Sequence, residues 1–370
     1  MSYTVTPNRA LPLNAYDTAA AATDQATIWR GGWVFVATSD QVAEPGDHLP
    51  IDVGGQPVIL LRAQNGDLRA ISNLCAHRGT LLVDEPGSTK RFQCPYHAWT
   101  YADDGRLLSV PFAEADDLDK DEHCLPTYAA GEWNGLVFVS LDPDVTPLAE
   151  RFAHLDEVVA PYGLDQLHHW TSQRGDEIWE ADWKLIITNA MESYHLFKVH
   201  PETLEPYSPT SGAYYIAGSA DGTATGGAST RGDDDYVLLS LPPNLVGVFS
   251  QGAFLWQAVF PAGPGRSRVV TGAAYRSADP AESGVVSGFL KRSASAVADA
   301  VIPDFLPEDK WICERGQRAT TGTFEPGALL PVEQVVIDFH HYLARQVHGT
   351  QAPSPATSTT VGIAKVTADG

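Results

Sequence analysis

The sequence predicts an α+β protein with an all-β N-terminal domain and a mixed C-terminal domain. The chain has 370 residues, which is enough for roughly two domains of ordinary size. Short strand patterns joined by turn signals fill residues 28–145, whereas amphipathic helical patterns alternate with strands over residues 146–350. The pattern therefore changes once, near residue 146, and we expect the domain boundary there.

Two hairpins organise the first domain. The run PVILLRAQNGDLRAISN contains two apolar segments joined by Asn65-Gly66, a strong hairpin signal, and WTYADDGRLL turns in the same way at Asp104-Gly105. The segments GGWVFVAT and WNGLVFVSLDP are rich in β-branched and aromatic residues and predict further strands. Residues 1–27 precede this domain as a polar lead-in with a short alanine-rich helix.

The second domain mixes both periodicities. A strand is expected to turn into a helix near Trp183 and to end at Pro201, since proline cannot continue a helix. The Gly/Ser/Thr/Asp-rich segment 211–235 predicts a loop, and the low-complexity residues 351–370 predict a disordered tail. The other expected elements are helices over 148–163, 283–305 and 330–347 and strands over 244–260 and 267–276.

Composition excludes several classes of protein. The net charge is −22, from 24 basic and 46 acidic residues, so general nucleic-acid binding is not expected. No run of about 18 apolar residues predicts a membrane span, and the N-terminus lacks the pattern of a secretory signal. Four cysteines do not make a disulfide scaffold, so we expect a reducing, cytoplasmic compartment.

Two short arms in the first domain carry metal-ligand residues. Cys75 and His77 form Cys-x-His, and Cys94 and His97 form Cys-x-x-His sixteen residues later. Four such ligands suit tetrahedral zinc, or a [2Fe–2S] cluster in which two histidines replace two cysteines on one iron. Zinc fingers usually pair like with like, whereas each arm here mixes the two types. The mixture favours the two-iron cluster.

A second candidate site lies in NAMESYHLFKVHP. Glu192 and His195 are three residues apart, so they would be neighbours on one face of a helix. His195 and His200 are five apart, which separates them by about 140° on a regular helix. Joint ligation of one metal therefore requires a distortion, such as a π-bulge, or the end of the helix between them.

The motifs C-x-H-R-G and C-P-Y-H-x-W resemble the Rieske motif, and the surrounding strands resemble the Rieske fold. The resemblance implies that Cys75 and Cys94 bind one iron of a [2Fe–2S] cluster and that His77 and His97 bind the other. With the histidine pair about 100 residues downstream, the chain resembles the catalytic α subunit of the Rieske non-haem iron oxygenases. The second domain is then expected to be a helix-grip, an antiparallel sheet around a long helix.

In that family a mononuclear Fe(II) is bound by two histidines and one carboxylate, which leaves positions for O₂. The resemblance assigns His195 and His200 as the histidines and Asp309, in LPEDKWICERGQRA, as the carboxylate. The competing carboxylates are Glu308, Asp304 and Glu314.

The resemblance also implies a role for Glu192. It would connect His195 to His97 of a neighbouring subunit and pass electrons between the metal sites, which requires a head-to-tail homotrimer of this chain alone. A separate NAD(P)H-dependent reductase or ferredoxin would supply those electrons. With a glutamate at position 192, the chain resembles the branch of the family that acts on quaternary ammonium compounds such as choline, betaines and carnitine.

The implied activity is a monooxygenase or dioxygenase that hydroxylates, demethylates or cleaves a small organic substrate, with a lean to a quaternary amine. Three alternatives stay open. One is an aromatic-ring hydroxylase, dioxygenase or aromatic O- or N-demethylase. The second is a Rieske electron carrier fused to a non-catalytic ligand-binding domain, and the third is a zinc-stabilised binding module.

Overall fold

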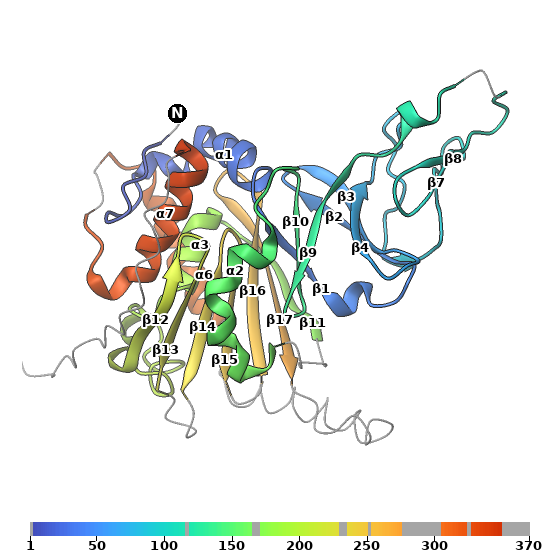
Figure 1. Ribbon diagram of the computed structural model, residues 1–370. Helices are drawn as coiled ribbons and strands as arrows, with labels where there is room; N and C mark the ends of the chain where they lie inside the picture. Colours follow the sequence, from blue (N-terminus) through green and yellow to red (C-terminus); the bar gives the residue numbers. More distant parts are fainter. Residues whose placement is uncertain are drawn as a thin grey trace, which may run out of the picture. The chain divides into compact units, whose positions relative to one another are not determined.

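The computed structural model describes residues 3–114, 118–164, 171–228, 235–250, 253–275, 305–323 and 327–349 (Figure 1). The chain forms two compact units, one of Gln25–Glu150 and one of Met1–Asp24 with Arg151–Gly370. The expected helix over 283–305, except for Phe305, and the expected tail over 351–370 lie outside the described residues. Among the helices that are described, none is long and apolar enough to cross a membrane.

The first unit is built from antiparallel strands, as the sequence predicts. The strands are β1 (Val34–Thr38), β2 (Asp47–Val53), β3 (Gln56–Arg62), β4 (Leu68–Ser72), β5 (Gly87–Ser88), β6 (Phe92–Gln93), β7 (Thr100–Tyr101), β8 (Leu107–Ser109), β9 (Thr127–Trp133) and β10 (Leu136–Ser140). A seven-stranded sheet has the order β1-β10-β9-β4-β3-β2-β5, and β6-β7-β8 form a small second sheet. The loops that follow β4 and β6 contain the two Cys/His arms.

The predicted hairpin turns are confirmed. Gly66 joins β3 to β4 with φ 91°, and Gly105 joins β7 to β8 with φ 85°. A third hairpin, between β9 and β10, is absent from the sequence prediction, which treats its turn as the start of a strand. Asn134 and Gly135 both have positive φ there, 52° and 79°, as a type I′ turn requires.

The second unit is built around one seven-stranded sheet. Its strands are β11 (Thr171–Trp179), β12 (Ala213–Ser219), β13 (Gly222–Gly227), β14 (Tyr236–Leu241), β15 (Leu245–Ser250), β16 (Ala253–Gly263) and β17 (Arg266–Tyr275). They form an antiparallel sheet in the order β11-β17-β16-β15-β14-β13-β12. The helices are α1 (Thr18–Asp24), α2 (Leu148–Val159), α3 (Trp183–Ala190), α4 (Leu196–Val199), α6 (Leu306–Ala319) and α7 (Gln334–His348).

The prediction of a loop over 211–235 is wrong for most of that segment. Residues 213–227 form the hairpin of β12 and β13, and 229–234 lie outside the described residues. The glycines there make room for neighbouring rings. A Cβ on Gly226 would lie 2.7 Å from the Tyr214 ring, and a Cβ on Gly227 would lie 2.5 Å from the Tyr236 hydroxyl. Close packing of strands, and not turn formation, explains this composition.

The two faces of the large sheet differ in what covers them. On one face, Tyr236 of β14 contacts Ser193, in the segment between α3 and α4, with the two hydroxyl oxygens 3.3 Å apart. Val237 points to the opposite face and pairs with Phe249, whose ring stacks on Phe254 and lies 5.5 Å from the ring of Tyr162. Phe254 therefore lies on the face away from the Ser193 segment.

A buried charge network fixes the start of α3. Lys184 is fully buried, and its ammonium group contacts Asp24 of α1 and lies 3.0 Å from Oδ1 of Asp182. Asp24 also accepts hydrogen bonds from the hydroxyl of Tyr3 and the indole N–H of Trp183. The lead-in is therefore part of the core of this unit.

Replacement of Lys184 by Met should destabilise the second unit by about 3–5 kcal/mol, since two buried carboxylates would lose their counter-charge. Lys310→Met is the matched control, because Lys310 forms an exposed pair with Glu177 and should contribute at most about 1 kcal/mol. Urea unfolding of both variants gives the comparison. Equal midpoints for Lys184→Met and the unmodified protein would contradict this role.

Candidate metal centres

The two Cys/His arms have the same backbone geometry. In the first arm, the N–H of Cys75 donates to the carbonyl of Thr80, and the N–H of Gly79 donates to the carbonyl of Cys75. In the second arm, the N–H of Cys94 donates to the carbonyl of Trp99, and the N–H of Ala98 donates to the carbonyl of Cys94. Each arm is thus a tight loop closed on its cysteine.

Each loop turns through the left-handed region. Gly79 has φ 74° at the fifth position of the first loop, and Ala98 has φ 58° at the same position of the second. A left-handed conformation is unfavourable for a residue with a Cβ, so Ala98 holds a strained backbone. Such strain is typical of loops whose conformation is imposed by a functional site.

The four candidate ligands separate by type. Cys75 and Cys94 are 2% and 3% exposed, whereas His77 and His97 lie at the surface. The two imidazole rings are 4.7 Å apart between centroids, and Trp99 stacks almost parallel on His77 at 4.8 Å. Two buried thiolates behind two adjacent surface imidazoles fit a [2Fe–2S] cluster whose outer iron is bound by the histidines.

A tyrosine supports the buried side of this site. The hydroxyl of Tyr101 lies 3.3 Å from Sγ of Cys75 and accepts a hydrogen bond from the N–H of Ala76 at 3.1 Å. Burial and the neighbouring Cys75 raise the pKa of Tyr101, so the hydroxyl keeps its proton. It can therefore donate to a metal-bound thiolate at Cys75.

The second candidate site depends on the end of the helix at α3 and the turn that follows it. The prediction of a helix that continues to Pro201 is wrong: α3 ends at Ala190, and α4 is a separate single turn. His195 is the residue before α4, and His200 is the residue after it, with non-helical φ −117° and ψ 43°. Of the two expected alternatives, a distortion such as a π-bulge or the end of the helix between the histidines, the structure has the second: α4 ends at Val199, and the two rings are 5.1 Å apart between centroids.

The structure brings Asp309 to the same point. Its Oδ1 lies 2.9 Å from Nε2 of His200 and 3.5 Å from Nε2 of His195, and the amide of Asn189 donates to it at 2.7 Å. The ligand atoms of the three residues all lie within 4.8 Å of one another. Two imidazoles and one carboxylate on one side of a point fit the facial arrangement used for non-haem Fe(II).

The other carboxylates have different positions. Glu308 contacts the outer nitrogen of His200, Nδ1, at 2.7 Å, so it faces away from the point where the other three converge. Glu314 accepts from the backbone N–H of Glu180 at 3.1 Å. Asp304 lies outside the described residues.

Glu192 contacts His195 without sharing a helix with it. Its Oε1 accepts from Nδ1 of His195 at 2.6 Å, while its Oε2 accepts from the backbone N–H of Tyr194 and, at 3.2 Å, from that of His195. The expected neighbourhood of the two side chains is therefore present, but a turn creates it. Each histidine thus has a carboxylate on Nδ1 and directs Nε2 toward Asp309.

The electrostatics of the site favour a cation. Burial alone would lower the pKa of His195, but hydrogen bonds to Asp309 and Glu192 raise it to about 9. Burial alone would raise the pKa of Asp309, but the two histidines lower it to about 2. A divalent metal would take the place of the imidazole protons, so metal uptake should release protons.

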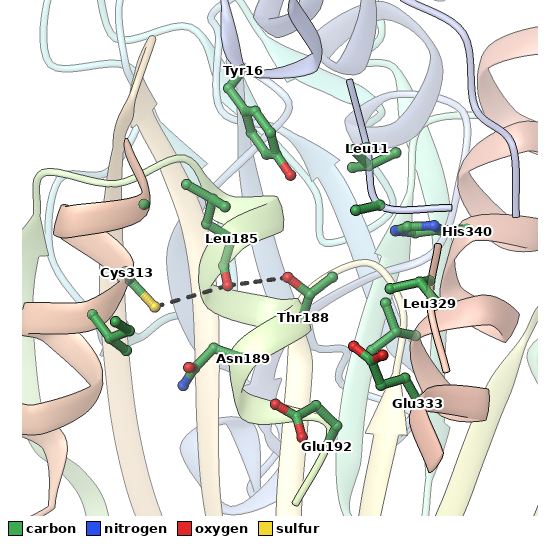
Figure 2. Close-up of a pocket in the computed structure, with 14 residues that line it drawn as sticks. Leu11, Tyr16, Leu185, Thr188, Asn189, Glu192, Cys313, Leu329, Glu333 and His340 are labelled. Atoms are coloured by element: carbon green, nitrogen blue, oxygen red, sulfur yellow. Dashed lines mark hydrogen bonds between the residues drawn. The ribbon is translucent and has the colours of Figure 1, made fainter. Parts of the chain in front are cut away.

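A cavity of about 300 Å³ lies beside α3, with Leu185, Thr188 and Asn189 in its wall (Figure 2). Asn189 and Glu192 lie at one end of it, and both hydrogen-bond to residues of the triad. The opposite walls come from the lead-in, α6 and α7, including Leu11, Cys313 and His340. The carboxylate of Glu192 therefore has free space beside it as well as a histidine.

Comparison with protein families matches both halves of the chain. Residues 32–129 match the family described as Rieske [2Fe-2S] domain. Residues 166–349 match the family described as ring hydroxylating alpha subunit, catalytic domain. The first match decides between the two interpretations of the Cys/His arms in favour of the two-iron cluster.

Two curated relatives indicate the breadth of the group. The glycine betaine monooxygenase oxygenase subunit of Chromohalobacter salexigens is 33% identical over 53% of this chain and 44% of its own. The 2-halobenzoate 1,2-dioxygenase large subunit of Burkholderia cepacia is 35% identical over 47% of this chain and 39% of its own. The chain thus covers less than half the length of these relatives.

A solved structure of the quaternary ammonium Rieske monooxygenase CntA shares the fold. It superposes with a TM-score of 0.78 over 93% of this chain and 97% of that one, at 21% identity. The predicted combination of an all-β Rieske domain with an α+β catalytic domain is confirmed.

Loss of the Tyr101 hydroxyl should lower the reduction potential of the cluster. A hydrogen bond to a cluster sulfur stabilises the reduced, more negative state. At about 0.5–1.5 kcal/mol per bond, Tyr101→Phe should shift the potential down by about 20–60 mV. Redox titration of the visible absorption measures this shift, with Tyr96→Phe as a control on an exposed ring. An unchanged potential in Tyr101→Phe would show that the hydroxyl does not donate to the cluster.

Proposed function

Because the chain belongs to the ring-hydroxylating oxygenase α subunits, with a Rieske domain ahead of the catalytic domain, we propose that it is the oxygenase component of a multicomponent enzyme. It uses O₂ and two electrons to oxidise a small organic substrate. The convergence of His195, His200 and Asp309 in a chain that also has a Rieske domain carries this proposal. An electron carrier with a non-catalytic second domain would have no need of such a triad.

The residues of the two sites have separate tasks. Cys75, His77, Cys94 and His97 would hold the cluster, and His195, His200 and Asp309 would hold Fe(II). When bound, the cluster supplies single electrons and the iron activates O₂. In monooxygenation, substrate, O₂, two electrons and two protons give the hydroxylated product and water.

The chain's own groups prepare the iron ligands. Glu192 accepts the Nδ1 proton of His195, which leaves the lone pair on Nε2 for the metal. Asn189 donates to Oδ1 of Asp309 and holds the orientation of that carboxylate. His195, His200 and Asp309 would hold the metal from one side, and a metal held in this way would supply open positions for O₂ beside the substrate.

We propose a quaternary amine as the substrate class. Glycine betaine monooxygenase and the quaternary ammonium monooxygenase CntA are among the similar proteins, and position 192 is a glutamate. Tyr236 adds an aromatic ring beside the Ser193 segment, and such rings attract ammonium groups. Hydroxylation of an N-methyl carbon would give a carbinol that releases formaldehyde and the demethylated amine. An aromatic acid is the second candidate, because the halobenzoate dioxygenase is similarly related.

The electrons come from outside the chain. We propose a separate NAD(P)H-dependent reductase or ferredoxin as donor and the cytoplasm as the compartment. Within a head-to-tail homotrimer, Glu192 would bridge His195 to the partner subunit's His97. The free space beside Glu192 supports this role, because the carboxylate can accept a second donor there.

A substrate screen tests the activity. The reduced protein is mixed with O₂ and candidate betaines, cholines or benzoates, and oxidation of the cluster is followed by its visible absorption. A betaine-class compound should speed cluster oxidation and yield formaldehyde. His195→Ala should keep the cluster spectrum, lose turnover and fall from about three irons per chain to about two. Turnover in His195→Ala would place the reactive metal elsewhere.

Replacement of Glu192 by Gln tests the bridge. The amide oxygen can still accept from one imidazole, so both metals should stay bound, but the negative charge and one acceptor are lost. Electron transfer from the cluster to the iron in a single turnover should therefore slow by at least about 10–100-fold. Rapid-quench and stopped-flow measurements on the reduced, substrate-bound protein give this rate. Glu333→Gln, in another wall of the same cavity, is the control and should transfer electrons at the normal rate. Normal transfer in Glu192→Gln would contradict the bridging role.

A further inference from the structure

Two adjacent carboxylates of α6 each contact one ring nitrogen of the buried His200. His200 is fully buried. Its Nε2 lies 2.9 Å from Oδ1 of Asp309, and its Nδ1 lies 2.7 Å from Oε2 of Glu308. Both carboxylates come from the first turn of the helix, so α6 and His200 are placed by the same contacts.

The carboxylate of Glu308 is itself held in place. Its Oε2 also accepts from the hydroxyl of Thr203 at 2.5 Å, three residues after His200. One oxygen therefore receives two donors from the chain segment that follows α4. Glu308 is 34% exposed in its side chain, so its charge stays in contact with solvent while its direction is fixed.

From these contacts, and resting on the proposed function, we propose that Glu308 is a positioning residue for the iron site. It accepts the Nδ1 proton of His200 and so keeps the lone pair on Nε2, where a metal binds. When a metal takes Nε2, the hydrogen bond to Asp309 is lost. The contact with Glu308 is then the hydrogen bond that continues to hold this ring.

Glu308 and Glu192 make matching contacts but differ in their surroundings. Glu192 holds His195 and also lines the cavity of Figure 2, where a further donor can approach. Glu308 does not line that cavity, and its partners are His200 and Thr203 of its own chain. Loss of Glu308 should therefore weaken metal binding, whereas loss of the Glu192 charge should mainly interrupt electron transfer.

Equilibrium binding of Fe(II) tests the assignment. Protein that keeps its cluster but has lost the mononuclear metal is titrated anaerobically with Fe(II) against a competing chelator. Glu308→Ala should bind Fe(II) about 10–100-fold more weakly, which is the usual effect of losing such a partner. Glu308→Gln should recover much of the affinity, because its amide oxygen still accepts from Nδ1. Glu314→Ala removes a carboxylate from the same helix and should bind normally.

Two further measurements separate positioning from a general structural role. The electron paramagnetic resonance spectrum of the nitric oxide adduct of the ferrous site should change in Glu308→Ala and return toward normal in Glu308→Gln. Thr203→Val should weaken Fe(II) binding in the unmodified chain but have no added effect in Glu308→Ala, since both act through one carboxylate.

The outcomes distinguish this inference from the proposed function. If the unmodified protein binds no third iron, the proposed function fails. If it binds iron and His195→Ala loses it, but Glu308→Ala stays within twofold of normal affinity with an unchanged spectrum, the positioning role alone is overturned.

Discussion

The interruption of the helix between Ala190 and Leu196 is the constraint on which the catalytic unit depends. On a continuous helix, His195 and His200 would point about 140° apart and could not share a metal. Glu192 stabilises the break, because its carboxylate accepts backbone N–H groups of Tyr194 and His195, as an N-cap side chain does. The same carboxylate holds the ring of His195. One side chain therefore closes the turn between α3 and α4 and orients the ring of His195.

The rest of the unit holds this break in position from both ends of α3. At its start, Lys184 is buried between Asp24 and Asp182, which ties the helix to the lead-in. At its end, Asn189 donates to Asp309 and ties the helix to α6. The lead-in thus contributes to the catalytic unit although it precedes the Rieske domain in sequence. A change in this buried network would displace His195, His200 and Asp309 without touching them.

Sequence reasoning predicted the parts of the sites that are local in the chain. The Cys/His arms and the pair His195 and His200 are each contained in short segments whose spacing indicates the chemistry. Asp309 lies over 100 residues away and came only from the family resemblance. The spacing could not separate Asp309 from Glu308, because the two carboxylates are adjacent and their sequence distances from His200 differ by one residue. The separation is geometric: one carboxylate meets the inner nitrogen of His200, and its neighbour meets the outer one.

The failure to predict strands β12 and β13 has a different cause. Glycine and threonine indicate loops when local preference alone is considered, but at Gly226 and Gly227 they create space for tyrosine rings on neighbouring strands. Tertiary packing therefore outweighs composition. This packing also places the aromatic residues, because the alternation of Tyr236 and Val237 decides which rings face the Ser193 segment. Phe254 lies on the other face.

The two metal centres use imidazoles in opposite ways. In the Rieske domain the thiols are buried and the histidines are exposed, so a cluster held there would have its histidine side at the surface of this chain. In the catalytic unit His200 is fully buried, and carboxylates hold the outer nitrogens of both histidines. Electron transfer needs a short path to the surface, whereas reaction with O₂ needs a site that solvent does not enter freely. Glu192 is the residue that contacts His195 and also lines the cavity.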